Sequence, residues 1–193
     1  MVDTVVSQVT KIHQEIIMAG FGGQGVLKMG QILAEAAMLE GREVVWTPAY
    51  GPEMRGGPAF CTVIISSEPI GSPVVARPDA VIIMDAPSLE KYQGQVSDTG
   101  ILLINSTLVD PARVKPGIAC YPIPVNAMAE EIGDTRIANM IMLGALLRLT
   151  ALAAPATILH ALAEALPERH HHLLPLNERA LEAGARVAEA LKG

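Results

Sequence analysis

Residues 19–26 read Ala-Gly-Phe-Gly-Gly-Gln-Gly-Val and mark the point where a short apolar segment gives way to a helical pattern. The preceding residues 15–18, Glu-Ile-Ile-Met, are typical of a strand. From Val26 to Ala37, apolar residues recur every three or four positions, which predicts a helix that ends near Gly41. The glycines therefore form a turn between a strand and a helix.

This turn satisfies the pattern G-x-G-x-x-G through Gly20, Gly22 and Gly25. At a helix N-terminus such a turn directs backbone N–H groups toward an anion, and no Cβ blocks close approach. The cofactor-binding residues predicted on this basis are Gly22, Gly23, Gln24 and Gly25. The same turn is also a compact way to pack a helix on a sheet.

The next apolar segment argues against a nicotinamide or flavin dinucleotide. A nicotinamide-binding unit needs Asp or Glu at the end of its second strand to hold a ribose hydroxyl. Residues 44–48, Val-Val-Trp-Thr-Pro, end without a carboxylate, and Glu43 stands at their beginning instead. A stand-alone dinucleotide-binding dehydrogenase is therefore the alternative and not the favoured interpretation.

Length and composition indicate one domain over residues 1–193, since half of the residues are hydrophobic and supply a substantial core. The net charge of −6 argues against nucleic acid as a partner. No window approaches the roughly 18 consecutive apolar residues that a membrane span needs. The N-terminus lacks the basic region and cleavage site of a signal peptide, so we expect a cytoplasmic protein without membrane contact.

Cysteines are scarce, and the histidines are mostly consecutive. Cys61 and Cys120 each lie alone in apolar sequence and are expected to be small core residues. Two cysteines cannot supply the four ligands of an iron–sulfur cluster or a Cys₄ zinc site. Three consecutive histidines, residues 170–172, point in different directions on a helix and are not expected to converge on one ion.

The order of the remaining segments predicts an α/β fold. The strand at 59–66 follows the strand at 44–47 without a helix, which excludes a parallel crossover and indicates a mixed sheet. Residues 80–84 and 101–104 are continuous apolar strands of the kind covered on both faces. We therefore expect a three-layer α/β/α architecture with a mixed, mostly parallel sheet, a Rossmann-like first βα unit and a helical C-terminal region.

The helical region after a last strand at 118–121 begins at Asn126, which is expected to cap a short helix. The longer helix that follows is apolar nearly all round at residues 139–149. Such a helix must be buried, either between the sheet and outer helices or under another subunit.

Ligands in open α/β sheets lie beyond the carboxyl ends of the strands. The polar residues expected there are Gln24, Thr47, Asp85, Asn105 and Ser106, each of which could equally be a helix cap or turn residue. Residues 48–58 form a loop with three prolines and three glycines that also holds Tyr50, Glu53 and Arg55. This loop is either an internally braced surface loop or part of a binding site.

Three segments together resemble the gamma subunit of 2-oxoacid:ferredoxin oxidoreductases, which corresponds to the gamma domain of pyruvate:ferredoxin oxidoreductase. They are Gly20 to Val26, the loop Tyr-Gly-Pro-Glu-Met-Arg-Gly-Gly at 50–57, and Asn-Glu-Arg-Ala-Leu-Glu-Ala-Gly at 177–184. The resemblance covers essentially the whole chain. It implies oxidative decarboxylation of a 2-oxoacid to an acyl-CoA, with electrons passed to ferredoxin.

The resemblance further implies that this chain has no activity and no catalytic residue of its own. Thiamine diphosphate, Mg²⁺ and [4Fe-4S] clusters would belong to alpha, beta and ferredoxin-like delta subunits, and coenzyme A would be the co-substrate. Arg55 and the glycine turn are the candidates to bind the phosphates of coenzyme A. The expected interface residues of the loop are Tyr50, Glu53, Met54, Gly56 and Gly57. Within the family, the sequence of this loop favours an enzyme that uses 2-oxoglutarate, followed by branched-chain 2-oxoacids and pyruvate. The isolated chain can also form a homodimer. A purely structural subunit is the other alternative.

Overall fold

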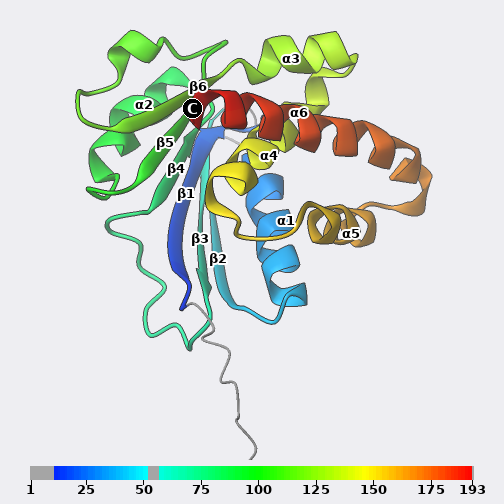
Figure 1. Cartoon of the computed structure of the whole chain (residues 1–193), viewed down its shortest axis with the longest axis horizontal. Coiled ribbons are helices and arrows are strands. Elements are labelled where there is room, and N and C mark those ends of the chain that lie inside the picture. Colours follow the sequence, from blue (N-terminus) through cyan, green and yellow to red (C-terminus); the bar gives the residue numbers. More distant parts are fainter. Residues whose placement is uncertain (1–10, 52–56, 193) are drawn as a thin grey trace, which may run out of the picture.

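The computed structural model describes residues 11–51 and 57–192. Six strands form one sheet in the order β2-β3-β1-β4-β5-β6 (Figure 1). The strands are β1 (His13–Phe21), β2 (Glu43–Tyr50), β3 (Pro58–Ser66), β4 (Ala80–Ile83), β5 (Ile101–Asn105) and β6 (Ala119–Ile123). The α-helices are α1 (Val26–Leu39), α2 (Ala86–Tyr92), α3 (Val125–Ile132), α4 (Ala138–Thr150), α5 (Pro155–Ala165) and α6 (Leu174–Lys192). Short 3₁₀ turns are η1 (Gln93–Gln95), η2 (Pro111–Arg113), η3 (Thr135–Ile137) and η4 (Glu168–Leu173).

The sheet is mixed, as predicted from the short connection between its second and third strands. β1, β4, β5 and β6 run parallel to one another, whereas β3 lies antiparallel to both β1 and β2. β3 therefore separates β2 from β1. The first βα unit, β1 and α1, is Rossmann-like, but the next strand, β2, does not lie beside β1.

Helices cover both faces of the sheet, which confirms the three-layer architecture. Figure 1 shows α1, α4, α5 and α6 on one side and α2 on the other. Successive residues of β1 alternate between these two cores, because strand side chains point to opposite faces. Ile16 and Met18 belong to the larger core under the C-terminal helices, and Ile17 and Ala19 to the smaller core under α2.

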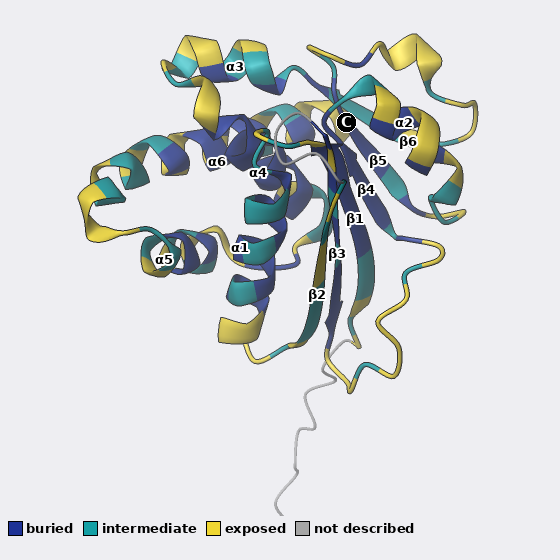
Figure 2. Ribbon diagram, turned by 180° about the vertical axis from the view of Figure 1, so that it is seen from behind, coloured by how far each residue is buried: buried dark blue, intermediate teal, exposed yellow. Residues whose placement is uncertain are grey.

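Helix α4 lies inside the molecule, between the sheet and α6. Every residue from Ala138 to Leu147 is buried (Figure 2). The two helices approach so closely at Gly144 and Gly184 that a Cβ on either glycine would overlap the backbone of the other helix. The first of the two expected environments for this helix is thus the observed one. Its apolar surface is used within the chain and is not available to another subunit.

Some local predictions differ from the structure. Asn126 does not cap α3, because the helix begins at Val125 after Pro124 and already includes Asn126. Pro122 lies within β6 and does not close it; β6 is an edge strand, where the missing N–H need not remove a ladder hydrogen bond. Asp134, by contrast, caps the turn that leads into α4, since its carboxylate accepts from Arg136 N at 2.9 Å.

In the part of the chain that the structure describes, no helix combines the length and the apolar character needed to cross a membrane.

Candidate functional site

The glycine turn lies at the carboxyl end of β1, where β1 leads into α1. Gly23 and Gly25 have φ values of 110° and 73°, which favour glycine because a side chain is strained there. The N–H of Gly22 donates to the carbonyl of Gly57 at 2.9 Å, and the N–H of Gln24 donates to the carbonyl of Phe21 at 3.2 Å. Of the four predicted anion-binding residues, Gly22 and Gln24 therefore already use their backbone donors within the chain.

The donors that remain for an anion are those of Gly23, Gly25 and the first turn of α1. Among the described residues, no hydrogen bond is formed by the N–H groups of Gly23 and Gly25. The N-cap of α1 is Gly25, which has no side chain to satisfy the first N–H groups of the helix. The turn thus presents donors that no described residue pairs, at the positive end of a helix dipole.

The side chain of Gln24 braces the turn. Its Oε1 accepts from Phe21 N, and its Nε2 donates to the carbonyl of Met84, both at 2.9 Å. A Cβ at Gly20 would overlap Gln24 Oε1 and come within 2.8 Å of Met84 Cβ, so this position requires glycine. The amide of Gln24 therefore ties the end of β1 to the end of β4.

Asn105 extends this polar network to β5 and α3. Its side chain is fully buried, and its Nδ2 donates to the carbonyl of Met84 at 3.3 Å and to Oδ1 of Asn126 at 2.7 Å. Its Oδ1 accepts from Thr107 N at 3.3 Å. The carbonyl of Met84 thus receives amide donors from both Gln24 and Asn105.

The structure brings together only part of the polar set expected at this edge. Gln24 and Asn105 meet at Met84, whereas Asp85 caps α2 by accepting from Ser88 N at 3.0 Å. Thr47 is exposed on β2, two strands from β1, and Ser106 is held through its backbone N–H by Ile123. The network role of Asn126 was missed, since the sequence suggested a helix cap there.

The two ends of the loop at 50–57 lie next to the glycine turn. Gly51 N donates to the carbonyl of Pro58 at 2.7 Å, and Gly57 is buried with its carbonyl bonded to Gly22. Tyr50 at the end of β2 is 68% exposed. The candidate residues Glu53, Met54, Arg55 and Gly56 lie outside the described residues. Only the described residues on either side of them, Gly51 and Gly57, are placed here, and the role of the four candidates stays a prediction.

An aromatic cavity of about 290 Å³ lies on the α2 side of the same sheet edge. Phe60 and Tyr92 contribute rings whose centroids are 5.7 Å apart. The ammonium of Lys91 lies 5.0 Å and 4.9 Å from the centroids of these two rings, and it is favoured there by the negative ring faces. The cavity reaches Gly20 and Phe21, so aromatic surface and a cation stand directly beside the glycine turn.

The consecutive histidines lie on the 3₁₀ turn η4 and not on an α-helix. The Nε2 of His171 lies 3.0 Å from the carbonyl oxygens of Ala163 and Leu166, and Nδ1 of His172 lies 2.9 Å from that of Arg169. Within residues 11–51 and 57–192, no group of three or more His, Cys, Asp or Glu side chains is arranged to hold a metal ion.

Burial raises the pKa of both free thiols, to about 12 for Cys61 and about 11 for Cys120. At pH 8 both are protonated, and only the thiolate is a nucleophile. We therefore expect an aromatic disulfide reagent to modify the folded chain slowly at pH 8, and the half-buried Cys120 before the fully buried Cys61. Unfolding in guanidinium should release both thiols at once. Rapid modification of both in the folded protein would contradict this description.

The sheet order also bears on dinucleotide binding. In a dinucleotide-binding unit the second strand lies parallel beside the first and ends in an acid. Here β3 separates β2 from β1, and β2 ends in Tyr50. We predict that calorimetric titration of the isolated chain gives no NAD(H) or FAD binding. A dissociation constant tighter than roughly 100 μM, about −5.5 kcal/mol, would contradict this.

A mixed α/β sheet with a glycine turn at its carboxyl edge and a helical C-terminal half defines the class of the protein. Residues 15–187 match the family described as pyruvate ferredoxin/flavodoxin oxidoreductase, and the chain belongs to this family. The predicted family resemblance is thereby confirmed.

Two relatives indicate which members of the family are similar. The chain is 40% identical over 172 residues to the ketoisovalerate oxidoreductase subunit VorA of Methanothermobacter thermautotrophicus, covering 89% of this chain and 35% of the relative. It is 37% identical over 161 residues to the 2-oxoglutarate synthase subunit KorC of Methanocaldococcus jannaschii, covering 82% and 86%. The chain thus spans about a third of the length of VorA but most of the length of KorC.

Two solved structures share the fold. The gamma subunit of a keto/oxoacid ferredoxin oxidoreductase from Geobacter sulfurreducens has a TM-score of 0.80 and 31% identity, with 93% of this chain and 98% of that chain covered. The 2-oxoglutarate:ferredoxin oxidoreductase from Magnetococcus marinus has a TM-score of 0.84 and 26% identity, with 92% and 31% covered. The fold of this chain therefore exists both as a separate subunit and as part of a longer chain.

Proposed function

We propose that the chain is the gamma subunit of a cytoplasmic, multi-subunit 2-oxoacid:ferredoxin oxidoreductase that uses 2-oxoglutarate. The enzyme would oxidatively decarboxylate its substrate to an acyl-CoA and pass the electrons to ferredoxin. The observation that supports 2-oxoglutarate is the coextensive match to KorC, which covers 86% of that subunit. Ketoisovalerate is the second candidate, because the identity to VorA is 40%.

The redox chemistry is assigned to partner subunits. Cys61 lies on β3 and Cys120 on the edge strand β6, with β1, β4 and β5 between these two strands. Two cysteines this far apart do not fit a [4Fe-4S] cluster, which needs four thiolates around one site. Thiamine diphosphate, Mg²⁺ and the clusters therefore belong to alpha, beta and delta subunits or to ferredoxin itself, and the chain alone has no activity.

The part played by this chain is to shape the access region for coenzyme A. The N–H groups of Gly23, Gly25 and the first turn of α1 suit a phosphate, because they combine donors that no described residue pairs with the positive end of a helix dipole. Arg55 on the adjoining loop can add a charge-assisted contact. The aromatic cavity around Phe60, Lys91 and Tyr92 continues this surface on the other side of the turn. The solved Magnetococcus marinus enzyme is described with coenzyme A bound.

Reconstitution with candidate partner subunits tests the function. The complex should oxidise 2-oxoglutarate in preference to ketoisovalerate and pyruvate, with coenzyme A and a ferredoxin-type acceptor, and should lose this activity when the chain is omitted. Because permanent interfaces bury on the order of 2,000 Å² or more, the complex should survive gel filtration. Failure to co-purify, together with oxidation that is unchanged without this chain, would overturn the proposal.

Arg55→Ala tests the contact to coenzyme A. We expect the variant to remain folded, since its loop is too rich in glycine and proline to belong to the core. Its kcat/KM for coenzyme A, or the assembly of the complex, should weaken by an amount equivalent to about 1.5–3 kcal/mol of free energy. Arg77→Ala is the matched control, because Arg77 is an exposed arginine paired with Asp98 outside the candidate site. Wild-type activity and assembly of Arg55→Ala would instead favour the braced surface loop or a purely structural subunit.

A further inference from the structure

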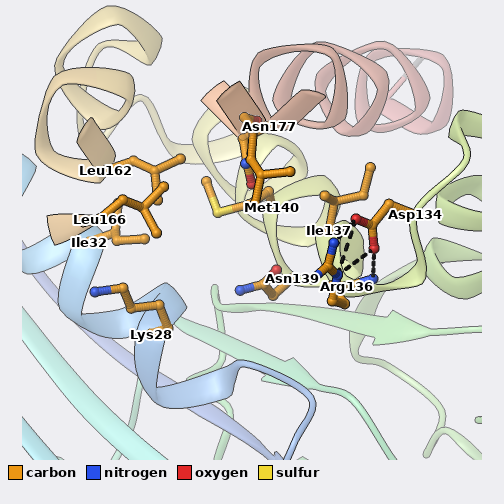
Figure 3. Close-up of a pocket in the computed structure, with 11 residues that line it drawn as sticks. Lys28, Ile32, Asp134, Arg136, Ile137, Asn139, Met140, Leu162, Leu166 and Asn177 are labelled. Atoms are coloured by element: carbon orange, nitrogen blue, oxygen red, sulfur yellow. Dashed lines mark hydrogen bonds and ion pairs between the residues drawn. The ribbon is translucent and has the colours of Figure 1, made fainter. Parts of the chain in front are cut away.

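A second cavity, of about 170 Å³, lies between α1, α4, α5 and α6 on the helical side of the glycine turn (Figure 3). Its wall is largely apolar and includes Ile32, Met140, Leu162 and Leu166. An engineered cavity of roughly 150 Å³ in another protein is large enough to hold benzene. This cavity therefore has room for a short aliphatic group.

Two asparagines place hydrogen-bond acceptors at this cavity. Asn139 is 8% exposed and its Nδ2 donates to the carbonyl of Gly25 at 3.4 Å; Asn177 is 9% exposed and its Nδ2 donates to the carbonyl of Leu173 at 2.8 Å. Because each amide nitrogen faces a carbonyl, each amide oxygen is the atom left for the cavity. Neither oxygen accepts a hydrogen bond from a described residue. Both oxygens stay accessible to solvent, so a donor on a ligand can reach them.

A cation stands at the same cavity. The ammonium of Lys28 is 3.4 Å from Oε1 of Gln31 and forms no ion pair with a carboxylate in the described part of the chain. Arg136 also lines the cavity, but both oxygens of Asp134 accept from its guanidinium (Figure 3). This pairing holds the pKa of the Asp134 carboxyl below its usual value, so the pair remains ionised and internally neutralised. Lys28 is thus the cation that is left to attract an anion.

We propose that this cavity binds an aliphatic α-amino acid. The carboxylate of the ligand pairs with Lys28, its ammonium donates to the amide oxygens of Asn139 and Asn177, and its side chain lies against Leu162 and Leu166. A 2-oxoacid with the same side chain has no ammonium and would form neither of these two hydrogen bonds. The loss of two hydrogen bonds from a charged donor is the basis for discrimination between the two ligands.

The position of Asn139 connects this site to the glycine turn. Its amide contacts the carbonyl of Gly25, and a Cβ on Gly25 would lie within 2.6 Å of the Asn139 nitrogen. An amino acid bound to Asn139 is therefore linked to the N-terminus of α1 through the side chain of Asn139 alone. Whatever free energy couples the two sites acts equally in both directions.

Calorimetry on the full chain, without partner subunits, tests the proposal, with L-leucine as the probe. We expect a Kd below about 1 mM for L-leucine. Two analogues with the same branched chain separate the contributions of its charged groups: 4-methyl-2-oxopentanoate lacks the ammonium and isopentylamine lacks the carboxylate. Each should bind at least about tenfold more weakly. Equal binding of the oxoacid, or a Kd for L-leucine weaker than about 10 mM, would overturn the amino-acid assignment.

Variants assign the binding to this cavity. Lys28→Gln should weaken L-leucine about tenfold and leave isopentylamine unchanged, because only the carboxylate contact is lost. Lys115→Gln, which changes an exposed lysine outside the cavity, should alter neither ligand. Leu166→Trp should abolish leucine binding by filling the cavity, with circular dichroism used to confirm the fold. Leucine binding that is unaffected by Lys28→Gln would place the ligand elsewhere and overturn the proposal.

Discussion

Gly144→Ala is expected to destabilise the chain by about 3 kcal/mol or more, although alanine is the better helix former. In the interior of an exposed helix, Gly→Ala stabilises by about 1 kcal/mol. At this position a Cβ would overlap the backbone carbonyl of Leu181 on α6, and a backbone cannot give way as a flexible side chain can. Overpacking of this kind typically costs about 1–3 kcal/mol and more where the structure cannot relax. The sign of the change therefore reports directly on the contact between α4 and α6.

Urea unfolding followed by circular dichroism measures this difference. Gly184→Ala should behave in the same way, because its Cβ would overlap the carbonyl of Ile141 on α4. Gly71→Ala is the control: a Cβ there meets nothing within 4 Å, so we expect a change of at most about 0.5 kcal/mol. Stabilisation by Gly144→Ala would mean that the two helices do not approach as closely as described.

Most of the fold follows from patterns that act locally. The alternation of Ile16, Ile17, Met18 and Ala19 between the two cores is a consequence of strand geometry and could be anticipated from an apolar segment followed by a glycine turn. The short connection between β2 and β3 leaves room only for an antiparallel pair. The antiparallel pair in the sheet therefore follows from the length of this connection, without knowledge of distant contacts.

The site was less predictable because its partners are distant in sequence. Gln24 bonds Met84, and Asn139 bonds Gly25, across separations of 60 and 114 residues. A glycine pattern indicates that a turn can bind an anion, but it does not reveal that the backbone donors of Gly22 and Gln24 are used inside the chain. Asn139 did leave a signal, since it is a polar residue in an otherwise apolar helical segment. Such a residue needs a buried partner, but the sequence does not identify which one.

The environment of α4 shows the same difference between composition and topology. A helix apolar nearly all round must be covered, and composition alone allows either its own chain or another subunit to cover it. The structure buries α4 against α6 and the sheet, so the case for an interface does not rest on this helix. It rests instead on the carboxyl edge of the sheet, where Phe21 in the glycine turn and Tyr50 at the end of β2 are both exposed.

Asn105→Asp is expected to destabilise the chain at pH 7 by about 3 kcal/mol or more, relative to wild type at the same pH. The new carboxylate would replace a donor that faces the carbonyl of Met84 at 3.3 Å and the amide oxygen of Asn126 at 2.7 Å. Asn105 is fully buried, so the charge would be desolvated as well as directed at two acceptors. An unpaired buried charge is among the most costly single changes in a protein interior.

The pH dependence of this loss identifies its cause. Burial and the two facing oxygens raise the pKa of the introduced carboxyl in the folded state above its value of about 3.9 in the unfolded chain. The protonated carboxyl can donate to the Met84 carbonyl, so the variant should approach wild-type stability near pH 4, below the folded-state pKa. The difference should grow as the pH rises through the interval between the two pKa values. Thr99→Asp adds the same charge at an exposed position outside this network and should change stability by at most about 0.5 kcal/mol at either pH. A loss for Asn105→Asp that is the same at pH 4 and pH 7 would show that shape, and not charge, is what the network at Met84 selects.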